Sequence, residues 1–493
     1  MGRRIKGEYS GVWRVTYRDR ETDEKKLKGN LGVASIVLMV VATAAPLTVM
    51  VASSPLIIGM GNGAAAPVDA GIATLIMLVF TVGFVAMSPY ITNAGAFYAY
   101  IQKGMGRCMG LGSATLALMS YSCILIGLEA YLGAALASFL AEHTGISINW
   151  MVLSAAVVGL VAFFGYRDLE LSSKFLGVAL IMEIAIVLVL NGAIFITNPA
   201  GMITSVPVRL ETILSGSPGL GILFAVYSFV GFESTVVYRE EAVDPDRTIP
   251  RATFLSVIIV GKFYMVSMWC EVVGIGFDDI RTTATNGGEA LYIDLSRAFL
   301  GHVATNLMEV LVVTSLFACI LSLHNIIVRY QHVLSRNGIL HPAISAVHRG
   351  HGSPHISSMA QSITSFAALF GLGALGLSPT MQIYAWGATA GTLGYMCIVA
   401  LTSLAVILFF RREGGNAGLW RTLVAPGLGF IGLMFCVYIA VDNLPDLIGG
   451  TNAQLAALGI VAFIISAFML GCIIALAMRT RQPERYALLA EPG

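Results

Sequence analysis

A carboxylate beside a glycine interrupts one of the apolar stretches of this chain. Glu233 lies two residues after Gly231, inside a run that is otherwise apolar from Gly219 to Tyr238. Where such a run crosses hydrocarbon, every backbone N–H and C=O needs a partner within the protein, so a broken helix persists only where it lines a site. An acid within the same run is a candidate functional residue. The pair therefore predicts a transport site near Gly231, with Glu233 as a proton-binding residue.

A second interruption lies in the first apolar run, at Pro46 within the segment 42–48. Proline removes a backbone donor and clashes with the carbonyl four residues earlier, which frees polar groups inside the run. Two interruptions five runs apart are typical of transporters built from inverted repeats, in which the ends of half-helices form the substrate site. The alternative is a simple proline kink at Pro46 together with an incidental glycine at Gly231.

Charged residues within the apolar runs are few, and their depth separates them. Glu183 and Lys262 each lie eight residues inside their runs, about 12 Å of helix rise. A buried carboxylate tends to take up a proton because desolvation disfavours its charged form, so Glu183 is a candidate proton carrier with Lys262 as its partner. A static Glu183–Lys262 ion pair is the alternative. Glu271 and Glu309 lie toward the ends of their runs, where a charge reaches water, and are predicted to be structural. Glu129 is at intermediate depth and is a further candidate proton site.

The composition shows what kind of element positions these residues. Of the 493 residues, 57% are hydrophobic and 12% are charged, which is too apolar for a soluble globule of this length. A helix needs about 20 apolar residues to cross the hydrocarbon of a bilayer. We therefore predict an all-α integral membrane protein with twelve transmembrane helices, at residues 31–60, 70–88, 109–140, 149–166, 175–197, 219–238, 253–276, 303–328, 356–376, 381–410, 422–441 and 453–478.

The charge distribution predicts the orientation of these helices. Most of the 29 Lys and Arg residues lie before residue 31, after residue 478, or in the alternate connections that fall on the same side. By the positive-inside rule, both termini are cytoplasmic and the chain is a multi-pass protein of the inner, cytoplasmic membrane, in contact with membrane lipid. The tail 1–30 is too charged to be a secretory signal, so we expect the first helix to be retained.

Other classes of function lack support in the sequence. The segment Gly59–Gly63 is rich in glycine, but it follows a membrane span rather than a strand and opens no nucleotide-binding unit. His348, His351 and His355 have spacings that a metal could use, yet no Cys or paired carboxylate accompanies them, and a solvated loop explains them. The seven cysteines form no disulfide framework. A net charge of +1 without a basic face excludes nucleic acid as a partner. No cofactor, metal site or catalytic constellation of a membrane-embedded enzyme is predicted.

Three segments resemble the amino acid-polyamine-organocation (APC) permeases. The run Phe224–Glu233 with its continuation Glu240–Ala252 resembles the sixth helix of these permeases and its cytoplasmic exit. The segment that joins their second and third helices is similar to Asn93–Tyr100 with Gly104, Gly106 and Arg107. The end of their eighth helix is similar to Asn325, Arg329, Ser335–Gly338 and Pro342. The resemblance covers the first eight predicted helices closely and the last four only in hydropathy.

The resemblance implies a LeuT-like fold with a 5+5 inverted repeat and discontinuous helices 1 and 6. It divides the chain into a cytoplasmic tail 1–30, a transport core 31–410, two accessory helices within 411–478 and a cytoplasmic tail 479–493. In such permeases the amides of the break in the first helix receive a substrate carboxylate, and carbonyls of the break in the sixth helix accept hydrogen bonds from its amine. Carried over by position, the substrate-binding residues are Ala44, Pro46, Leu47, Thr48, Tyr227, Val230 and Gly231.

The chain departs from the pattern of these permeases at two positions. Many members have a glycine-rich turn where this chain has Pro46–Thr48, which supplies one fewer amide donor. Proton-coupled members often have a lysine where this chain has Glu183.

Tyr227 flanks the second break, where an aromatic ring would close the site from one side. Packing against lipid or the tenth helix is the alternative.

Together these features predict a secondary-active permease for amino acids or small organic amines. No ATP-binding motif is present, so a proton gradient or substrate exchange must drive transport. A polyamine or cationic amine carrier, or a substrate exchanger, is the alternative.

Overall fold

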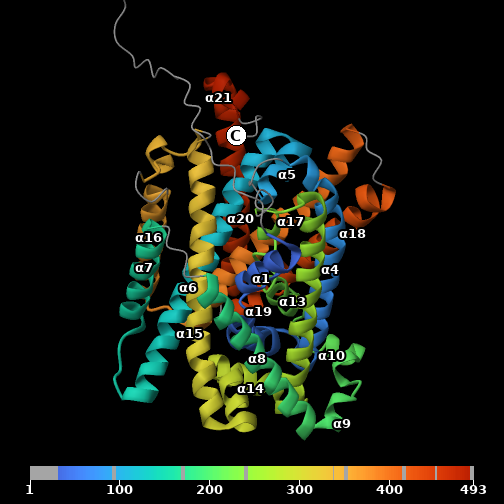
Figure 1. Ribbon diagram of the computed structural model, residues 1–493, viewed down its shortest axis with the longest axis vertical. Coiled ribbons are helices and arrows are strands. Elements are labelled where there is room, and N and C mark those ends of the chain that lie inside the picture. Colours follow the sequence, from blue (N-terminus) through green and yellow to red (C-terminus); the bar gives the residue numbers. More distant parts are fainter. Residues whose placement is uncertain are drawn as a thin grey trace, which may run out of the picture.

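The computed structural model describes residues 31–91, 96–167, 173–237, 242–336, 338–348, 353–413, 418–449 and 452–488. Within these ranges the regular secondary structure is helical, apart from one isolated bridge between Leu31 and Ala242. Figure 1 shows an elongated bundle whose long helices run roughly parallel to its long axis. The tail predicted at 1–30 lies outside the described residues.

The helices follow the apolar runs of the sequence. The first run forms α1 (Val33–Ala44), α2 (Pro46–Thr48), η1 (Val49–Ser53), α3 (Ser54–Leu56) and η2 (Ile57–Asn62), of which η1 and η2 are π-helical. The next long helices are α4 (Ala66–Met87), α5 (Ala96–Met105), α6 (Arg107–Thr144), α7 (Trp150–Arg167) and α8 (Ser173–Thr197). The sixth run forms α11 (Pro218–Tyr227) and α12 (Ser234–Val237). The remaining elements of the core are α13 (Pro245–Ile275), α14 (Ile280–Gly287), α15 (Leu291–Arg336), α16 (His355–Ala374), η9 (Pro379–Tyr384) and α17 (Ala385–Glu413). The chain continues with η10 (Trp420–Val424), α18 (Ala425–Asp442), α20 (Ala453–Arg481) and α21 (Pro483–Leu488).

Eight helical segments of the described chain are long and apolar enough to cross a membrane by length and composition. One of them, Val33–Tyr90, contains both the first run and α4, and two shorter apolar helices lie at Trp150–Tyr166 and Pro218–Tyr227. Large apolar side chains are exposed along the outside, as at Leu75, Ile181 and Ile465. Because hydrocarbon is an apolar solvent, this surface fits a bilayer.

The most enclosed long helix is α17, which packs against α6, α5 and α18. Small residues allow this close approach. A Cβ at Gly387 would lie 2.6 Å from the carbonyl oxygen of Cys123, and one at Gly391 would lie 2.7 Å from that of Ser120. Helices in membranes associate largely through such backbone proximity. The pair α6 and α17 therefore forms a tightly packed wall beside the two interrupted helices.

Two further features connect distant parts of the chain. Gly301 has φ +75° and divides α15 into two helical parts. The start of the first helix lies beside the segment that follows α12, where the Val243 N–H donates to the Leu31 carbonyl at 3.2 Å. The segments that flank these two interrupted helices are thus in direct contact.

Candidate transport site

The first helix is broken at Ala45, one residue before the predicted position. Ala45 has φ +45° and ψ +70°, a left-handed conformation that is unusual for a residue with a side chain. The break leaves the carbonyls of Thr43 and Ala44 at the end of α1, where the Ala44 oxygen accepts a hydrogen bond from the Tyr264 hydroxyl at 3.0 Å. Pro46 begins the next half-helix, whose first amides, those of Leu47 and Thr48, have no partner within the helix. Side chains Pro46, Leu47 and Thr48 are all buried.

The sixth helix is broken at Gly231. Helix α11 ends at Tyr227, and a series of tight turns continues to Glu233 before α12 begins. Gly231 has φ +101°, and a Cβ there would lie 2.7 Å from the Cγ2 atom of Thr43. Both interruptions are therefore true helix breaks, not a kink and an incidental glycine, and they lie against each other.

Glu233 holds the second break in place. Its Oε2 atom accepts the Gly231 N–H at 3.0 Å, and its Oε1 atom accepts a hydrogen bond from the Tyr121 hydroxyl of α6. The Tyr395 hydroxyl of α17 lies 3.4 Å from both Glu233 Oε2 and the Phe229 carbonyl. Glu233 is 3% exposed. A change in its charge would thus act on the turn and on both wall helices.

Glu183 is connected to the first break through two hydroxyl groups. Thr48 donates to the Ser315 hydroxyl at 3.0 Å, and Ser315 donates to Glu183 Oε2 at 2.7 Å. The predicted pair with Lys262 is wrong for this structure: Lys262 is exposed on α13, and no ion pair among the described residues joins it to Glu183. Depth along the helix was predicted from the sequence, but the direction in which each side chain faces was not.

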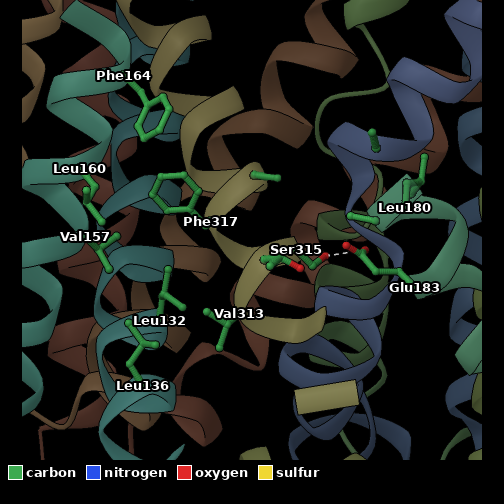
Figure 2. A pocket seen from close by; sticks show the side chains of 14 residues that line it. Leu132, Leu136, Val157, Leu160, Phe164, Leu180, Glu183, Val313, Ser315 and Phe317 are labelled. Carbon is green, nitrogen blue, oxygen red and sulfur yellow. Dashed lines mark hydrogen bonds between the residues drawn. The ribbon is translucent and has the colours of Figure 1, made fainter. Parts of the chain in front are cut away.

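A pocket of about 370 Å³ lies beside Glu183, between α1, α6, α7, α8 and α15. Figure 2 shows Glu183 and Ser315 at one end and apolar side chains such as Leu132 and Phe164 along the rest. The lining of this pocket is mostly apolar. Its polar side chains are the carboxylate of Glu183 and the hydroxyls of Thr314 and Ser315.

Tyr227, the last residue of α11, belongs to an aromatic cluster. Its ring lies 6.4 Å from that of Tyr384, which lies 4.9 Å from the ring of Tyr131. The Tyr384 hydroxyl lies 3.1 Å from the Ser53 hydroxyl, and Tyr131 donates to the Val51 carbonyl at 3.4 Å. Tyr227 therefore packs against the predicted tenth helix, and Val230 is also buried, at 8% exposure. We call Tyr131, Tyr227 and Tyr384 the tyrosine cluster.

Besides Glu183, three buried acids of the described chain lie outside the two breaks. Glu129 is 1% exposed, and its Oε2 atom has no hydrogen-bond partner within the described chain. Glu271, expected to reach water, is instead fully buried and contacts Ser54. Asp69 was not recognised because α4 begins earlier than the predicted run; it is buried and accepts a hydrogen bond from Asn62 at 2.9 Å.

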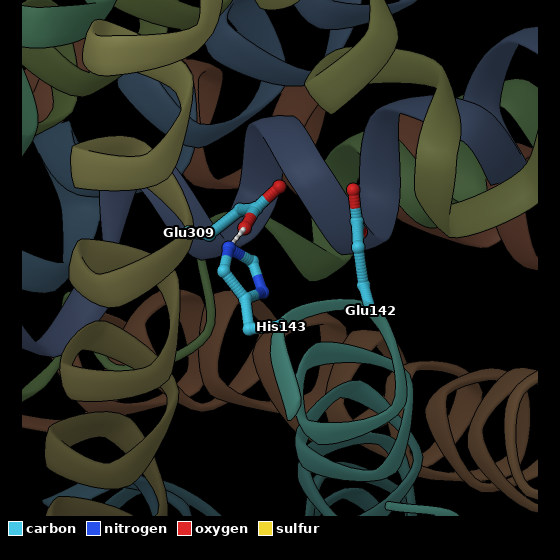
Figure 3. A group of neighbouring side chains, drawn as sticks. All are labelled: Glu142, His143 and Glu309. Carbon is cyan, nitrogen blue, oxygen red and sulfur yellow. Dashed lines mark ion pairs between the residues drawn. The ribbon is translucent and has the colours of Figure 1, made fainter. Parts of the chain in front are cut away.

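One group of side chains has spacings that could suit a metal. Ligand atoms of Glu142, His143 and Glu309 lie within 4.8 Å of one another (Figure 3). However, Arg297 lies 2.9 Å from Glu142 and 3.5 Å from Glu309, so its guanidinium already supplies the positive charge. This ion-pair network links the end of α6 to α15.

Of the predicted histidine set, His348 and His355 are described, and His351 lies outside the described residues. The two rings are 5.3 Å apart and both contact the ring of Tyr166. They are therefore engaged in packing at this connection.

The chain matches the family model described as "Amino acid permease" over residues 31–465. It belongs to this family. The permease is 24% identical over 333 residues to the "Low-affinity putrescine importer PlaP" of Escherichia coli (strain K12), a match that covers 64% of this chain and 69% of the relative. It is 27% identical over 224 residues to "Uncharacterized protein MJ0609" of Methanocaldococcus jannaschii, covering 45% of this chain and 49% of that protein. The family and the importer confirm the resemblance to APC permeases, and the permease is a multi-pass membrane transporter of amino acids or amines.

Proposed function

We propose that this permease works by alternating access, with the substrate bound where the two helix breaks meet. The observation that supports this most directly is the contact between Thr43 and Gly231, which brings the unwound ends of helices 1 and 6 together. In this proposal the chain has twelve transmembrane helices: ten form a 5+5 inverted repeat within 31–410, and two accessory helices lie within 411–478. Both termini lie in the cytoplasm, as the positive-inside rule suggests.

The groups at the breaks suit an amine and, less fully, a carboxylate. The amides of Leu47 and Thr48 stand at the positive end of the half-helix that Pro46 begins, where an anion is stabilised. Carbonyls at Ala44, Tyr227, Val230 and Gly231 would accept hydrogen bonds from an ammonium group; those of Ala44, Tyr227 and Gly231 already accept one bond each within the protein and would use their second lone pair. Because Pro46 contributes no N–H, fewer donors than acceptors face the substrate.

This imbalance supports the amine alternative within the same function. An amine substrate without a carboxylate is compatible with the relative that is named as a putrescine importer. It is also compatible with the buried acids Glu183 and Glu129. An amino acid remains the first proposal because its amine and carboxylate would use both breaks.

Proton coupling is proposed for Glu233 and Glu183. Glu233 bonds to the turn of helix 6, and Glu183 reaches helix 1 through Ser315 and Thr48. A protonation change at either carboxylate would therefore alter the packing of a half-helix, and a ligand that binds one conformer better shifts the population toward it. Glu129 is the next candidate, whereas the exposed Lys262 has no role in this mechanism.

The test is uptake into proteoliposomes that contain the purified permease. A panel of radiolabelled amino acids and amines, putrescine included, is offered with and without an imposed pH gradient. We expect saturable uptake of at least one member and accumulation that follows the proton gradient. Uptake of no member would refute the substrate class, and uptake insensitive to the gradient would refute proton coupling.

A further inference from the structure

The strongest unexplained feature outside the transport site is the contact between Glu271 and Ser54. Glu271 lies near the end of α13 and Ser54 begins α3, and both side chains are completely buried. The Ser54 Oγ atom lies 2.6 Å from the Met50 carbonyl oxygen and 2.9 Å from Glu271 Oε1. Both distances are typical of hydrogen bonds between oxygen atoms.

The number of protons available at this contact is limited. A serine hydroxyl has one hydrogen to donate and can also accept. A carbonyl oxygen only accepts, and an ionised carboxylate only accepts. Ser54 therefore cannot donate fully to both Met50 and an ionised Glu271. Both contacts become full hydrogen bonds only if Glu271 has a proton on Oε1, donates it to Ser54, and Ser54 donates to Met50.

The surroundings of Glu271 offer no positive charge in place of that proton. From α15, Tyr292 faces it with a hydroxyl that has no hydrogen-bond partner in the described chain, and Cys270 is its neighbour on α13. From α8, Asn191 is directed to Ser267 at 2.9 Å. None of the ion pairs among the described residues includes Glu271.

The basic residue of the neighbouring α14, Arg281, contacts other groups. Its guanidinium donates to the Ser215 carbonyl at 3.2 Å and lies 3.5 Å from the Gly59 carbonyl. An ionised carboxylate that is buried without a counter-charge is costly, and neutralisation by a proton removes that cost.

We propose that Glu271 is a proton-binding site, distinct from the carboxylates at the helix breaks, and that Ser54 is the acceptor of its proton. The site lies near α14, at the end of the bundle opposite α21 (Figure 1), and close to the tyrosine cluster. Ser53, the residue before Ser54, is 3.1 Å from the Tyr384 hydroxyl. Loss of the proton breaks one of the two bonds of Ser54, and because Ser53 and Ser54 are adjacent, the change reaches Tyr384.

The connection of this site to transport rests on the proposed function, but proton binding does not. The first test is therefore infrared spectroscopy of the purified permease. A protonated carboxylic acid has a carbonyl band that an ionised carboxylate lacks, and the difference between wild type and Glu271→Gln isolates the band of one residue. We expect one such band near neutral pH. The absence of this band from the difference spectrum would overturn the proposal.

Ser54→Ala tests the same site without removing the acid. The proton of Glu271 then loses its acceptor, so we expect the carbonyl band to move to the frequency of a weaker hydrogen bond. Ser267→Ala is the matched control, because it removes a buried hydroxyl one turn away on α13 and leaves Ser54 in place. An unmoved band in Ser54→Ala, or an equal shift in Ser267→Ala, would contradict the assignment even if Glu271→Gln failed to fold.

The second test is transport. The amide of a glutamine can donate to Ser54 as the protonated acid does, so Glu271→Gln imitates the protonated state permanently. For the best-transported member of the panel, we expect Glu271→Gln to retain substrate exchange within about threefold of wild type and to change the pH profile of uptake, while the part of the pH response that Glu233 and Glu183 supply remains. The wild-type protein could show the infrared band while Glu271→Gln keeps a wild-type pH profile of uptake. That result would mean that Glu271 binds a proton without coupling it to transport, and it would overturn the link to Tyr384. If wild type itself shows no pH response, the proposed coupling fails while the infrared result stands.

Discussion

Glu233 offers the sharpest test of the transport site because three donors converge on it. Glu233→Gln preserves the shape of the side chain and removes its ability to ionise. The amide oxygen can still accept the Gly231 N–H, and the Tyr121 hydroxyl can turn to accept from the new amide. Apart from the longer Tyr395 contact at 3.4 Å, two hydrogen bonds to a charged group then become two neutral ones.

The magnitude follows from that exchange. A hydrogen bond to a charged group contributes about 1.5–3 kcal/mol and a neutral one about 0.5–1.5 kcal/mol, so each of the two bonds loses about 1 kcal/mol. The conformer that these two bonds stabilise should therefore be destabilised by about 2 kcal/mol in Glu233→Gln, which is roughly a thirtyfold change in population. We expect the transport rate to fall by about five- to thirtyfold and the pH dependence of uptake to flatten.

The assay is initial uptake into proteoliposomes across a pH series, with the amount of folded protein measured by size-exclusion chromatography. Two substitutions that each remove one tyrosine hydroxyl measure how much each hydrogen bond to Glu233 contributes to the transport rate. Tyr121→Phe removes the closer bond and should have the larger effect, and Tyr395→Phe removes one at 3.4 Å and should have the smaller. If Glu233→Gln transported at the wild-type rate with an unchanged pH profile, the assignment of Glu233 as a coupling residue would be wrong.

Four further substitutions and one control test the rest of the site. Pro46→Ala restores an amide at the start of α2 and lets the helix close over groups that the substrate would satisfy, so substrate affinity should fall about tenfold with little loss of thermal stability; an unchanged Kd would remove Pro46 from the site. Tyr227→Ala should change the apparent KM by about fivefold or more if the tyrosine cluster closes over substrate, whereas a lower yield with unchanged KM would indicate packing alone. Glu183→Gln should abolish accumulation against a gradient while exchange continues, and Ser315→Ala should weaken the same step because it breaks the link to helix 1. Lys262→Met is the control for Glu183→Gln, and an equally large effect of both would contradict the geometry described here.

The helix breaks could be predicted from the sequence because they depend on local backbone chemistry. A proline in an apolar run and a glycine beside an acid both conflict with an unbroken helix, whatever surrounds them. The conformation at Ala45 could not be predicted in the same way, since a left-handed alanine is imposed by the helices packed around it and leaves no compositional signal.

The partners of the buried acids were hidden for a different reason. Position along a run gives depth in the membrane, but rotation about the helix axis decides whether Lys262 faces outward and whether Glu271 is covered. Ser54 and Ser315 complete the hydrogen-bond chains of two acids, yet single serines in apolar helices are common and form no pattern. Only tertiary packing identifies which serine meets which carboxylate.

The hydrogen bond between Val243 and Leu31 has a practical consequence for experiments on the permease. It joins Leu31, two residues before α1, to the segment that follows α12. One backbone hydrogen bond contributes about 1 kcal/mol net, a factor of about five in the population of the joined form. A truncation or tag that ends directly at Leu31 would therefore disturb the contact between the two interrupted helices.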